Sequence, residues 1–127
     1  MKKVIVIAED NKSLNELIRL RLEKTGYEVY SCFDGASALE KILETMPDLV
    51  VLDLDLPDIY GFELLGRIRQ KEELAKTKVI ILTGVTTRLG DTTSDEKWKN
   101  MTGVNVFLSK PHDTEDFLKK IDELLQD

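Results

Sequence analysis

The stretch VVLDLDLP, residues 50–57, is an aliphatic run that gains two carboxylates as it ends. A short, continuous apolar run is typical of a strand covered on both faces, as in a parallel sheet packed between helices. A charge is costly to bury unless it is paired or neutralised, so Asp53 is expected where the strand leaves the core. The stretch therefore predicts a parallel sheet with acidic side chains at its carboxyl edge.

The rest of the chain alternates strand and helix patterns. Apolar runs predict strands at residues 3–8, 27–33, 49–53, 78–83 and 105–109. Periodic apolar residues predict helices that begin near Ser13 and after Asp34, and further helices over residues 62–69 and 113–125. Residues 84–103 interrupt this rhythm with a polar, Thr-rich loop and a short helical pattern over residues 94–101. Five strands alternating with helices predict one α/β domain, residues 1–127, with right-handed crossovers.

Local signals place the helix ends and the core faces. Ser13 and Glu16 fit a capping box, Gly26 suits the end of the first helix, and Asp34 can cap the second, which stops before Pro47. Residues expected to face the core are Leu14, Leu17, Ile18, Leu22, Cys32, Phe33, Phe62 and Phe117.

Composition narrows the range of functions. The net charge of −6 and the absence of a Lys/Arg stripe argue against direct contact with a nucleic-acid backbone. The start MKKVIVIAED has too short an apolar run for a secretory signal or a membrane span, so a cytoplasmic protein is expected. Cys32 is the single cysteine and cannot form an intramolecular disulfide.

Polar side chains follow four of the five predicted strands. Glu9 and Asp10 follow the first strand, Asp53 ends the third, Thr83 ends the fourth and Lys110 follows the fifth. Any one of them could simply solvate a loop. Because ligands of open parallel sheets bind beyond the carboxyl ends of the strands, the set together predicts a functional site.

The chemistry of this set favours phosphoryl transfer. Crowded carboxylates of Glu9, Asp10 and Asp53 repel one another unless a cation neutralises them, and oxygen ligands favour Mg²⁺ or Mn²⁺. Mg²⁺ commonly keeps positions for phosphate oxygens, which Lys110 and Thr83 could also bind. With no Ser or Cys evidently paired to a base, Asp53 is the candidate nucleophile and would form an aspartyl phosphate. His112 is expected to be a loop residue rather than a base.

The same residues resemble the receiver domain of two-component response regulators over essentially the whole chain. The resemblance rests on Glu9-Asp10, on DLDLPDIYG at residues 53–61, on Thr83 thirty positions after Asp53, and on Lys110-Pro111. It implies a doubly wound (βα)5, flavodoxin-like three-layer sandwich with a five-stranded parallel sheet in the order 2-1-3-4-5. It also implies a phosphoacceptor signalling domain rather than an enzyme, catalysing only its own phosphorylation and dephosphorylation.

The resemblance implies a role for each matching residue. Asp53 corresponds to the phosphoacceptor, Asp10 to a direct Mg²⁺ ligand, and Glu9 to an acidic partner acting through metal-bound water. The backbone carbonyl of Asp55 would complete the protein ligands. The remaining roles fall to Thr83 as the switch hydroxyl, Phe107 as the aromatic switch residue, Lys110 as the phosphate-binding lysine and Pro111 as the residue that positions it.

A switch mechanism follows from these roles. Phosphorylation would add close to two negative charges and draw Thr83 inward, and Phe107 would rotate into the vacated space. The phosphoryl donor would be a sensor histidine kinase or a phosphotransfer protein. The output partner is open, as is the choice between a monomer and a phosphorylation-dependent dimer.

Five features depart from the usual receiver pattern. Glu9 replaces the commoner Asp, Asp55 adds a negative charge, Gly84 follows Thr83, and Tyr60 precedes Gly61 where a small polar residue is common. The distance from Thr83 to Lys110 is about five residues longer than the family leads one to expect, which leaves the output surface undefined.

Two other functions remain open. A receiver-like binding module that is never phosphorylated would also keep this fold. An Asp-nucleophile phosphatase is a weaker alternative, because DLDL at residues 53–56 resembles the D-x-D signature of haloacid-dehalogenase-type enzymes but closes the third strand and carries Leu56 at the usual Thr or Val position. The initiating Met1 and the closing Gln126-Asp127 favour a stand-alone receiver over a fragment of a larger regulator.

Overall fold

The computed structural model describes residues 2–83, 106–109 and 114–126, with the backbone alone at Thr83, at Val106–Ser109 and at Thr114. The strands are β1 (Val4–Ala8), β2 (Glu28–Cys32), β3 (Leu49–Asp53), β4 (Lys78–Thr83) and β5 (Val106–Ser109). The helices are α1 (Lys12–Lys24), α2 (Gly35–Thr45), α3 (Gly61–Arg69) and α6 (Thr114–Leu125), with a short 3-10 turn η1 (Glu72–Leu74). The predicted helix over residues 94–101 falls outside the described residues.

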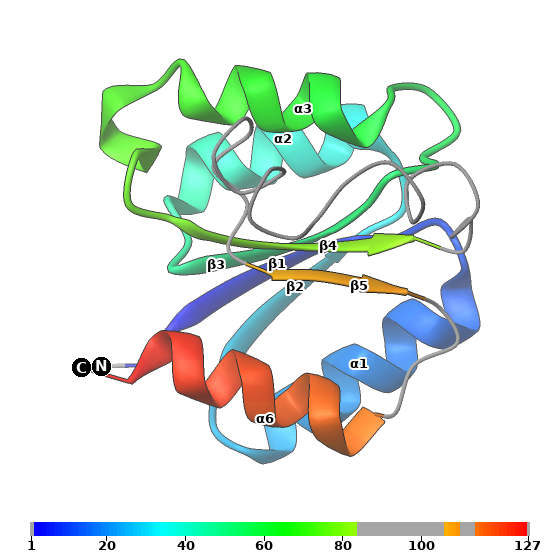
Figure 1. Ribbon diagram of the computed structural model, residues 1–127, viewed down its shortest axis with the longest axis vertical. Coiled ribbons are helices and arrows are strands. Elements are labelled where there is room, and N and C mark those ends of the chain that lie inside the picture. Colours follow the sequence, from blue (N-terminus) through cyan, green and yellow to red (C-terminus); the bar gives the residue numbers. More distant parts are fainter. Residues whose placement is uncertain (1, 84–105, 110–113, 127) are drawn as a thin grey trace.

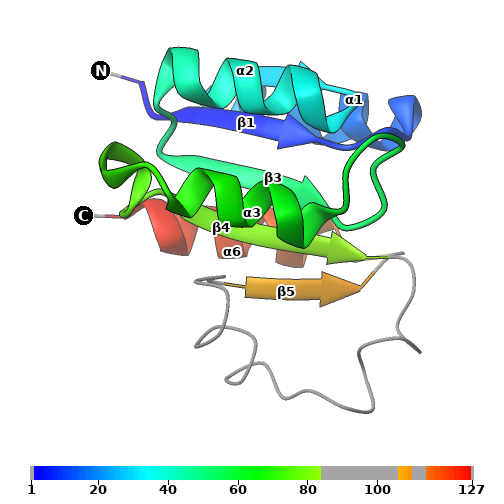
Figure 2. The same cartoon turned by 90° about the horizontal axis from the view of Figure 1, so that it is seen from above.

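The strands form one parallel sheet in the order β2-β1-β3-β4-β5, which confirms the predicted topology. Helices α2 and α3 cover one face, and α1 and α6 cover the other (Figure 1). The arrowheads of β1, β3, β4 and β5 point to the same edge of the sheet (Figure 2). The carboxyl ends of these four strands therefore lie along one edge of the sheet.

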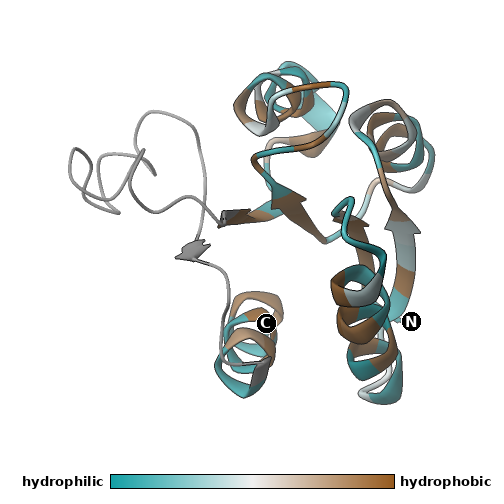
Figure 3. Ribbon diagram, turned by 90° about the vertical axis from the view of Figure 1, so that its right-hand side faces the viewer, coloured by the Kyte–Doolittle hydropathy of each residue, from teal (hydrophilic) through white to brown (hydrophobic). Residues whose placement is uncertain are grey.

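Two apolar cores lie on the two faces of the sheet. Alternate residues of β1 supply them, since Val6 and Ala8 pack towards α2 and α3 whereas Ile5 and Ile7 pack towards α1 and α6. The central strands are largely apolar, and each helix carries both apolar and polar residues (Figure 3). Burying one such aliphatic side chain contributes about 1.5–3 kcal/mol, so the central strands are a rigid support for the edge residues.

Helix ends follow the predicted chemistry with one correction. The Asp34 side chain accepts from Ser37 N and caps α2, which ends at Met46 in a left-handed conformation (φ 48°) just before Pro47. The prediction of Ser13 as the cap of the first helix is wrong. Asn11 caps α1 instead, through its side-chain oxygen and the N–H of Leu14 at 3.0 Å.

Two predicted core residues lie at the surface. Leu17 is 43% exposed and Phe33 is 41% exposed, whereas Ile18, Leu22 and Phe117 are buried as predicted. The buried face of α1 is thus displaced to one side of the apolar stripe. Cys32 is buried, in agreement with its predicted packing role.

Candidate metal centre

Three carboxylates meet at the carboxyl edge of the two central strands. Glu9 and Asp10 follow β1 and Asp53 ends the adjacent β3, and one ligand oxygen from each lies within 4.8 Å of those of the other two. Glu9 is fully buried, Asp53 is 3% exposed and Asp10 is exposed. The predicted acidic cluster therefore exists, with two of its three members almost removed from solvent.

The donor set fits a hard divalent cation. All of the atoms offered are carboxylate oxygens, which Mg²⁺ and Mn²⁺ prefer to softer ligands. Two oxygens bound directly to one Mg²⁺ at 2.0–2.1 Å can be at most about 4.2 Å apart. The oxygens of Glu9, Asp10 and Asp53, all within 4.8 Å of one another, are therefore close enough to share one such cation, directly or through bound water.

Backbone and side-chain hydrogen bonds fix Glu9. Its N–H donates to the carbonyl of Cys32 at 3.1 Å, and its Oε2 accepts from the N–H of Asn11 at 2.9 Å. The fully buried Asn15 donates through Nδ2 to the carbonyls of Glu9 (2.9 Å) and Cys32 (3.0 Å). Asn15 thus joins α1 to the chain at the ends of β1 and β2, at the backbone of Glu9 itself.

The sequence interpretation missed Asn15, although a signal was present. Asn15 stands three residues before Ile18 and seven before Leu22, so a polar side chain interrupts the inward stripe of α1. A buried amide at such a place must find hydrogen-bond partners, and here it finds strand-end carbonyls.

The turn after β3 holds Asp53 and Asp55 in a compact loop. Asp53 Oδ1 accepts from the N–H of Asp55 at 3.1 Å, and Asp55 pairs with Tyr60 in an antiparallel bridge. The N–H of Gly61 donates to the carbonyl of Leu54 at 2.9 Å. A Cβ on Gly61 would lie 2.8 Å from the Asp53 carbonyl oxygen, so glycine is required for this close approach.

Asp58 in the same loop was also missed. Its carboxylate accepts from the N–H groups of Gly35 (2.7 Å) and Ala36 (2.9 Å) at the start of α2. These backbone donors, that of Gly35 foremost, hold the pKa of Asp58 below its usual value. The partners lie 22 and 23 residues away in sequence, beyond the reach of a local pattern.

The remaining predicted site residues are placed by backbone alone or not at all. Thr83 ends β4 in register with Ser109, and Phe107 of β5 is in register with Ile81. The side chains of Thr83 and Phe107 lie outside the description, as do Lys110, Pro111 and His112. The structure thus brings together Glu9, Asp10 and Asp53 and leaves the rest of the predicted set as predictions.

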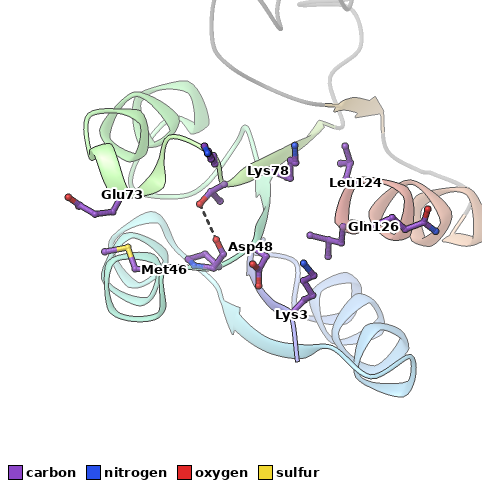
Figure 4. A pocket seen from close by; sticks show the side chains of 11 residues that line it. Lys3, Met46, Asp48, Glu73, Lys78, Leu124 and Gln126 are labelled. Carbon is purple, nitrogen blue, oxygen red and sulfur yellow. Dashed lines mark hydrogen bonds between the residues drawn. The ribbon is translucent and has the colours of Figure 1, made fainter. Parts of the chain in front are cut away.

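A separate cavity of about 320 Å³ opens at the opposite edge of the sheet (Figure 4). Its lining carries charges of both signs, contributed by Lys3, Lys78, Asp48 and Glu73. Gln126 lies at its α6 side. The cavity adjoins the amino ends of the strands. It is therefore remote from the carboxylate cluster and takes no part in that chemistry.

Residues 5–122 match the family described as response regulator receiver domain. The DNA-binding dual master transcriptional regulator RpaA of Synechocystis sp. is 33% identical over 122 residues, which is 96% of this chain and 48% of the relative. The chain thus spans about half the length of that curated relative.

Solved structures agree with this match. The chemotaxis response regulator CheY4 of Vibrio cholerae has 25% identity and a TM-score of 0.84, with 98% of this chain and 100% of that chain covered. TrrA of Thermotoga maritima, solved in complex with Mg²⁺ and BeF, has 30% identity and a TM-score of 0.78, with 98% and 100% covered. No helix within the described parts of this chain is long and apolar enough to cross a membrane. The chain belongs to the receiver domain family of response regulators, the signalling domains of two-component systems.

Proposed function

We propose that Asp53 accepts a phosphoryl group in a Mg²⁺-dependent reaction and that residues 1–127 form one receiver domain built around this step. The observation that carries the proposal is the meeting of Glu9, Asp10 and Asp53 within 4.8 Å at the end of β1 and β3. Asp53 combines near-complete burial with a backbone hydrogen bond from Asp55. Its carboxylate is therefore held in one orientation, as an attacking nucleophile requires.

The metal ion would be held by Asp10 and Asp53 directly, by the backbone carbonyl of Asp55, and by Glu9 through water. When bound, Mg²⁺ supplies positive charge that offsets the carboxylates and the phosphoryl oxygens. The related TrrA was solved in complex with Mg²⁺ and BeF, which supports a Mg²⁺ site in a receiver of this kind. Mn²⁺ has the same ligand preference and is expected to substitute.

The reaction is an in-line displacement at phosphorus. An oxygen of Asp53 forms the new P–O bond while the bond from phosphorus to the donor breaks. A phosphohistidine donor leaves as an imidazole, and a small acyl phosphate such as acetyl phosphate leaves as a carboxylate. Phosphoryl transfer of this kind depends on positioning and on neutralising charge. In this proposal Lys110 binds a phosphoryl oxygen, Thr83 donates a hydrogen bond to another, and Pro111 positions Lys110.

The phosphorylated state would differ from the free state in the surface near β4 and β5. Thr83 drawn towards the phosphoryl group leaves space for Phe107, and both residues lie on neighbouring strands. Phosphorylation can only bias states that the domain already samples, and a shift from 1:99 to 99:1 needs roughly 5.5 kcal/mol. The Asp55 carboxylate, next to the site, is expected to affect the lifetime of the phosphoryl group.

The proposed phosphoryl donor is a sensor histidine kinase or a phosphotransfer protein, the proposed location of the receiver is the cytoplasm, and the output partner is unidentified. The net charge of −6 makes direct contact with nucleic acid by this domain unfavourable. RpaA is a DNA-binding regulator about twice as long as this chain. The receiver could pass its signal to a further domain of the same protein or to a separate protein. The receiver itself would act as a monomer or as a phosphorylation-dependent dimer.

Intact-mass measurement after incubation with acetyl phosphate and Mg²⁺ tests the proposal. The expected result is a gain of one phosphoryl group that requires Mg²⁺ and is absent from the Asp53→Asn variant. Folded protein that gains no phosphoryl group and releases no inorganic phosphate would support a binding module that is never phosphorylated. Rapid release of phosphate over many turnovers would support a phosphatase.

A further inference from the structure

The side chain of Asp58 ties the loop between β3 and α3 to the start of α2. The two oxygens of Asp58 accept separately, Oδ1 from Gly35 N at 2.7 Å and Oδ2 from Ala36 N at 2.9 Å. Asp58 belongs to the loop that follows Asp53, whereas Gly35 and Ala36 are the first two residues of α2. The carboxylate therefore bridges two elements that are separate in sequence.

The first turn of α2 divides its N–H donors between two aspartates. Asp34, its own cap, accepts from Ser37 N at 2.7 Å, while Asp58 accepts from the two donors before it. A helix leaves its first N–H groups without helical partners, and a negative charge near them is favourable. Asp58 is thus an interlocking cap supplied by the loop, and Asp34 is an ordinary local cap on the same helix.

Close packing reinforces this bridge. A Cβ added to Gly35 would lie 1.8 Å from Cγ2 of Ile59, which is the residue after Asp58. Only a glycine lets Ile59 approach the helix start at this distance. Polar and apolar contacts therefore fix the same two loop residues against α2.

We propose that Asp58 is a positioning residue for the metal site, acting by holding the loop that carries Asp55. The inference rests on the proposed function, in which the Asp55 carbonyl is a Mg²⁺ ligand. The bridge between Asp55 and Tyr60 and the hydrogen bond from Gly61 N to Leu54 O hold the two ends of the loop together. The Asp58 carboxylate holds the middle of the loop against the start of α2.

A backbone ligand has no rotamers of its own, so its position depends wholly on the conformation of its loop. Groups that orient metal ligands typically change metal affinity by 10–100-fold when they are removed. Loss of the Asp58 anchor lets the loop sample conformations in which the Asp55 carbonyl is turned away from the metal. Binding then has to restore the loop conformation, which weakens the apparent affinity for Mg²⁺.

The test compares Asp58→Ala with Asp34→Ala, using Mg²⁺ titration of the full chain followed by backbone amide NMR shifts. Both variants remove a carboxylate cap from the same helix, so both are expected to lower the thermal unfolding midpoint. Asp58→Ala is expected to weaken Mg²⁺ binding about tenfold, and Asp34→Ala is expected to leave it unchanged. Asp58→Asn keeps one acceptor oxygen and should restore part of the affinity.

Phosphorylation rates give a second readout. In Asp58→Ala the Mg²⁺ concentration needed for half-maximal rate with acetyl phosphate should rise, while the rate at saturating Mg²⁺ approaches that of the unaltered chain. Equal Mg²⁺ affinity in Asp58→Ala and the unaltered chain, or an equal loss in Asp34→Ala, overturns the positioning role and leaves the proposed function standing. An unaltered chain that binds no Mg²⁺ overturns the metal site and the positioning role together.

Discussion

The side-chain amide of Asn15 donates hydrogen bonds to the backbone carbonyls of Glu9, at 2.9 Å, and of Cys32, at 3.0 Å. Glu9 N also donates to the Cys32 carbonyl, so the ends of β1 and β2 and the first turns of α1 are joined at one point. Asn15 is fully buried there. The backbone of Glu9, a member of the acidic cluster, is therefore held by a buried polar side chain from the face of α1 that otherwise packs apolar residues against the sheet.

Asn15→Ala should be strongly destabilising, because it leaves two buried carbonyls with fewer donors and opens a small cavity. A loss of about 2–4 kcal/mol in the free energy of unfolding is expected, measured by urea denaturation. Asn11→Ala is the matched control, since it removes the exposed cap of the same helix and should cost about 1 kcal/mol. Equal losses in the two variants would contradict the role assigned to Asn15.

Gly35→Ala should destabilise the domain by about 1–3 kcal/mol, because its new methyl group would collide with Ile59. Gly66→Ala is the control within α3, where an added Cβ meets nothing within 4 Å. That second change should stabilise the exposed helix by up to about 1 kcal/mol through helix propensity. Thermal unfolding of both variants checks the contrast, and a stable Gly35→Ala protein would argue against the close contact.

Combining Gly35→Ala with Ile59→Ala tests the identity of the colliding group. Removal of the Ile59 branch should recover part of the stability lost in Gly35→Ala, giving a coupling energy of about 0.5–3 kcal/mol in a double-mutant cycle. Strictly additive losses would place the collision elsewhere.

Cys32 should resist alkylation in the folded protein. Burial is the main cause that raises the pKa of its thiol from a usual value of 9.0 to about 11, against a lowering by Lys41. The thiolate is the reactive form, so iodoacetamide at pH 8 should label the native protein far more slowly than the urea-unfolded chain. Native labelling as fast as that of the unfolded chain would show an accessible thiolate instead.

The sign of the linked stability follows from this raised pKa. The native state holds the neutral thiol more strongly than the unfolded state does, so the Cys32 contribution is fully present below the unfolded pKa of about 9. It is lost as the pH rises from there through about 11. Urea midpoints between pH 7 and pH 10 should fall more steeply for the unaltered chain than for Cys32→Ala.

The fold and the acidic cluster could be predicted from the sequence because both follow from which residues form strands and from where those strands end. Strands β3 and β4 match the predicted residues 49–53 and 78–83, since continuous aliphatic runs mark the strands buried on both faces. The cluster follows from topology, because residues that end parallel strands meet at one edge. Neither conclusion needed a contact between distant side chains.

The failures arise where two local signals compete or where partners are distant. Asn11 and Ser13 are both good capping residues, but α1 begins at Lys12, which puts Asn11 at the cap position and Ser13 inside the first turn. Leu17 belongs to the apolar stripe of α1 by spacing, but the sheet contacts the side that carries Asn15, Ile18 and Leu22. Leu17→Ala should therefore cost far less stability than Ile18→Ala, which is expected to lose about 2–5 kcal/mol in urea denaturation.

The most direct test of the central claim is to locate the phosphoryl group. After treatment with acetyl phosphate and Mg²⁺, sodium borohydride reduces an aspartyl phosphate to homoserine, and peptide mass spectrometry then identifies the altered residue. The account predicts homoserine at position 53, dependent on Mg²⁺ and on prior phosphorylation. Modification at another carboxylate, or none in folded protein that binds Mg²⁺, would contradict it.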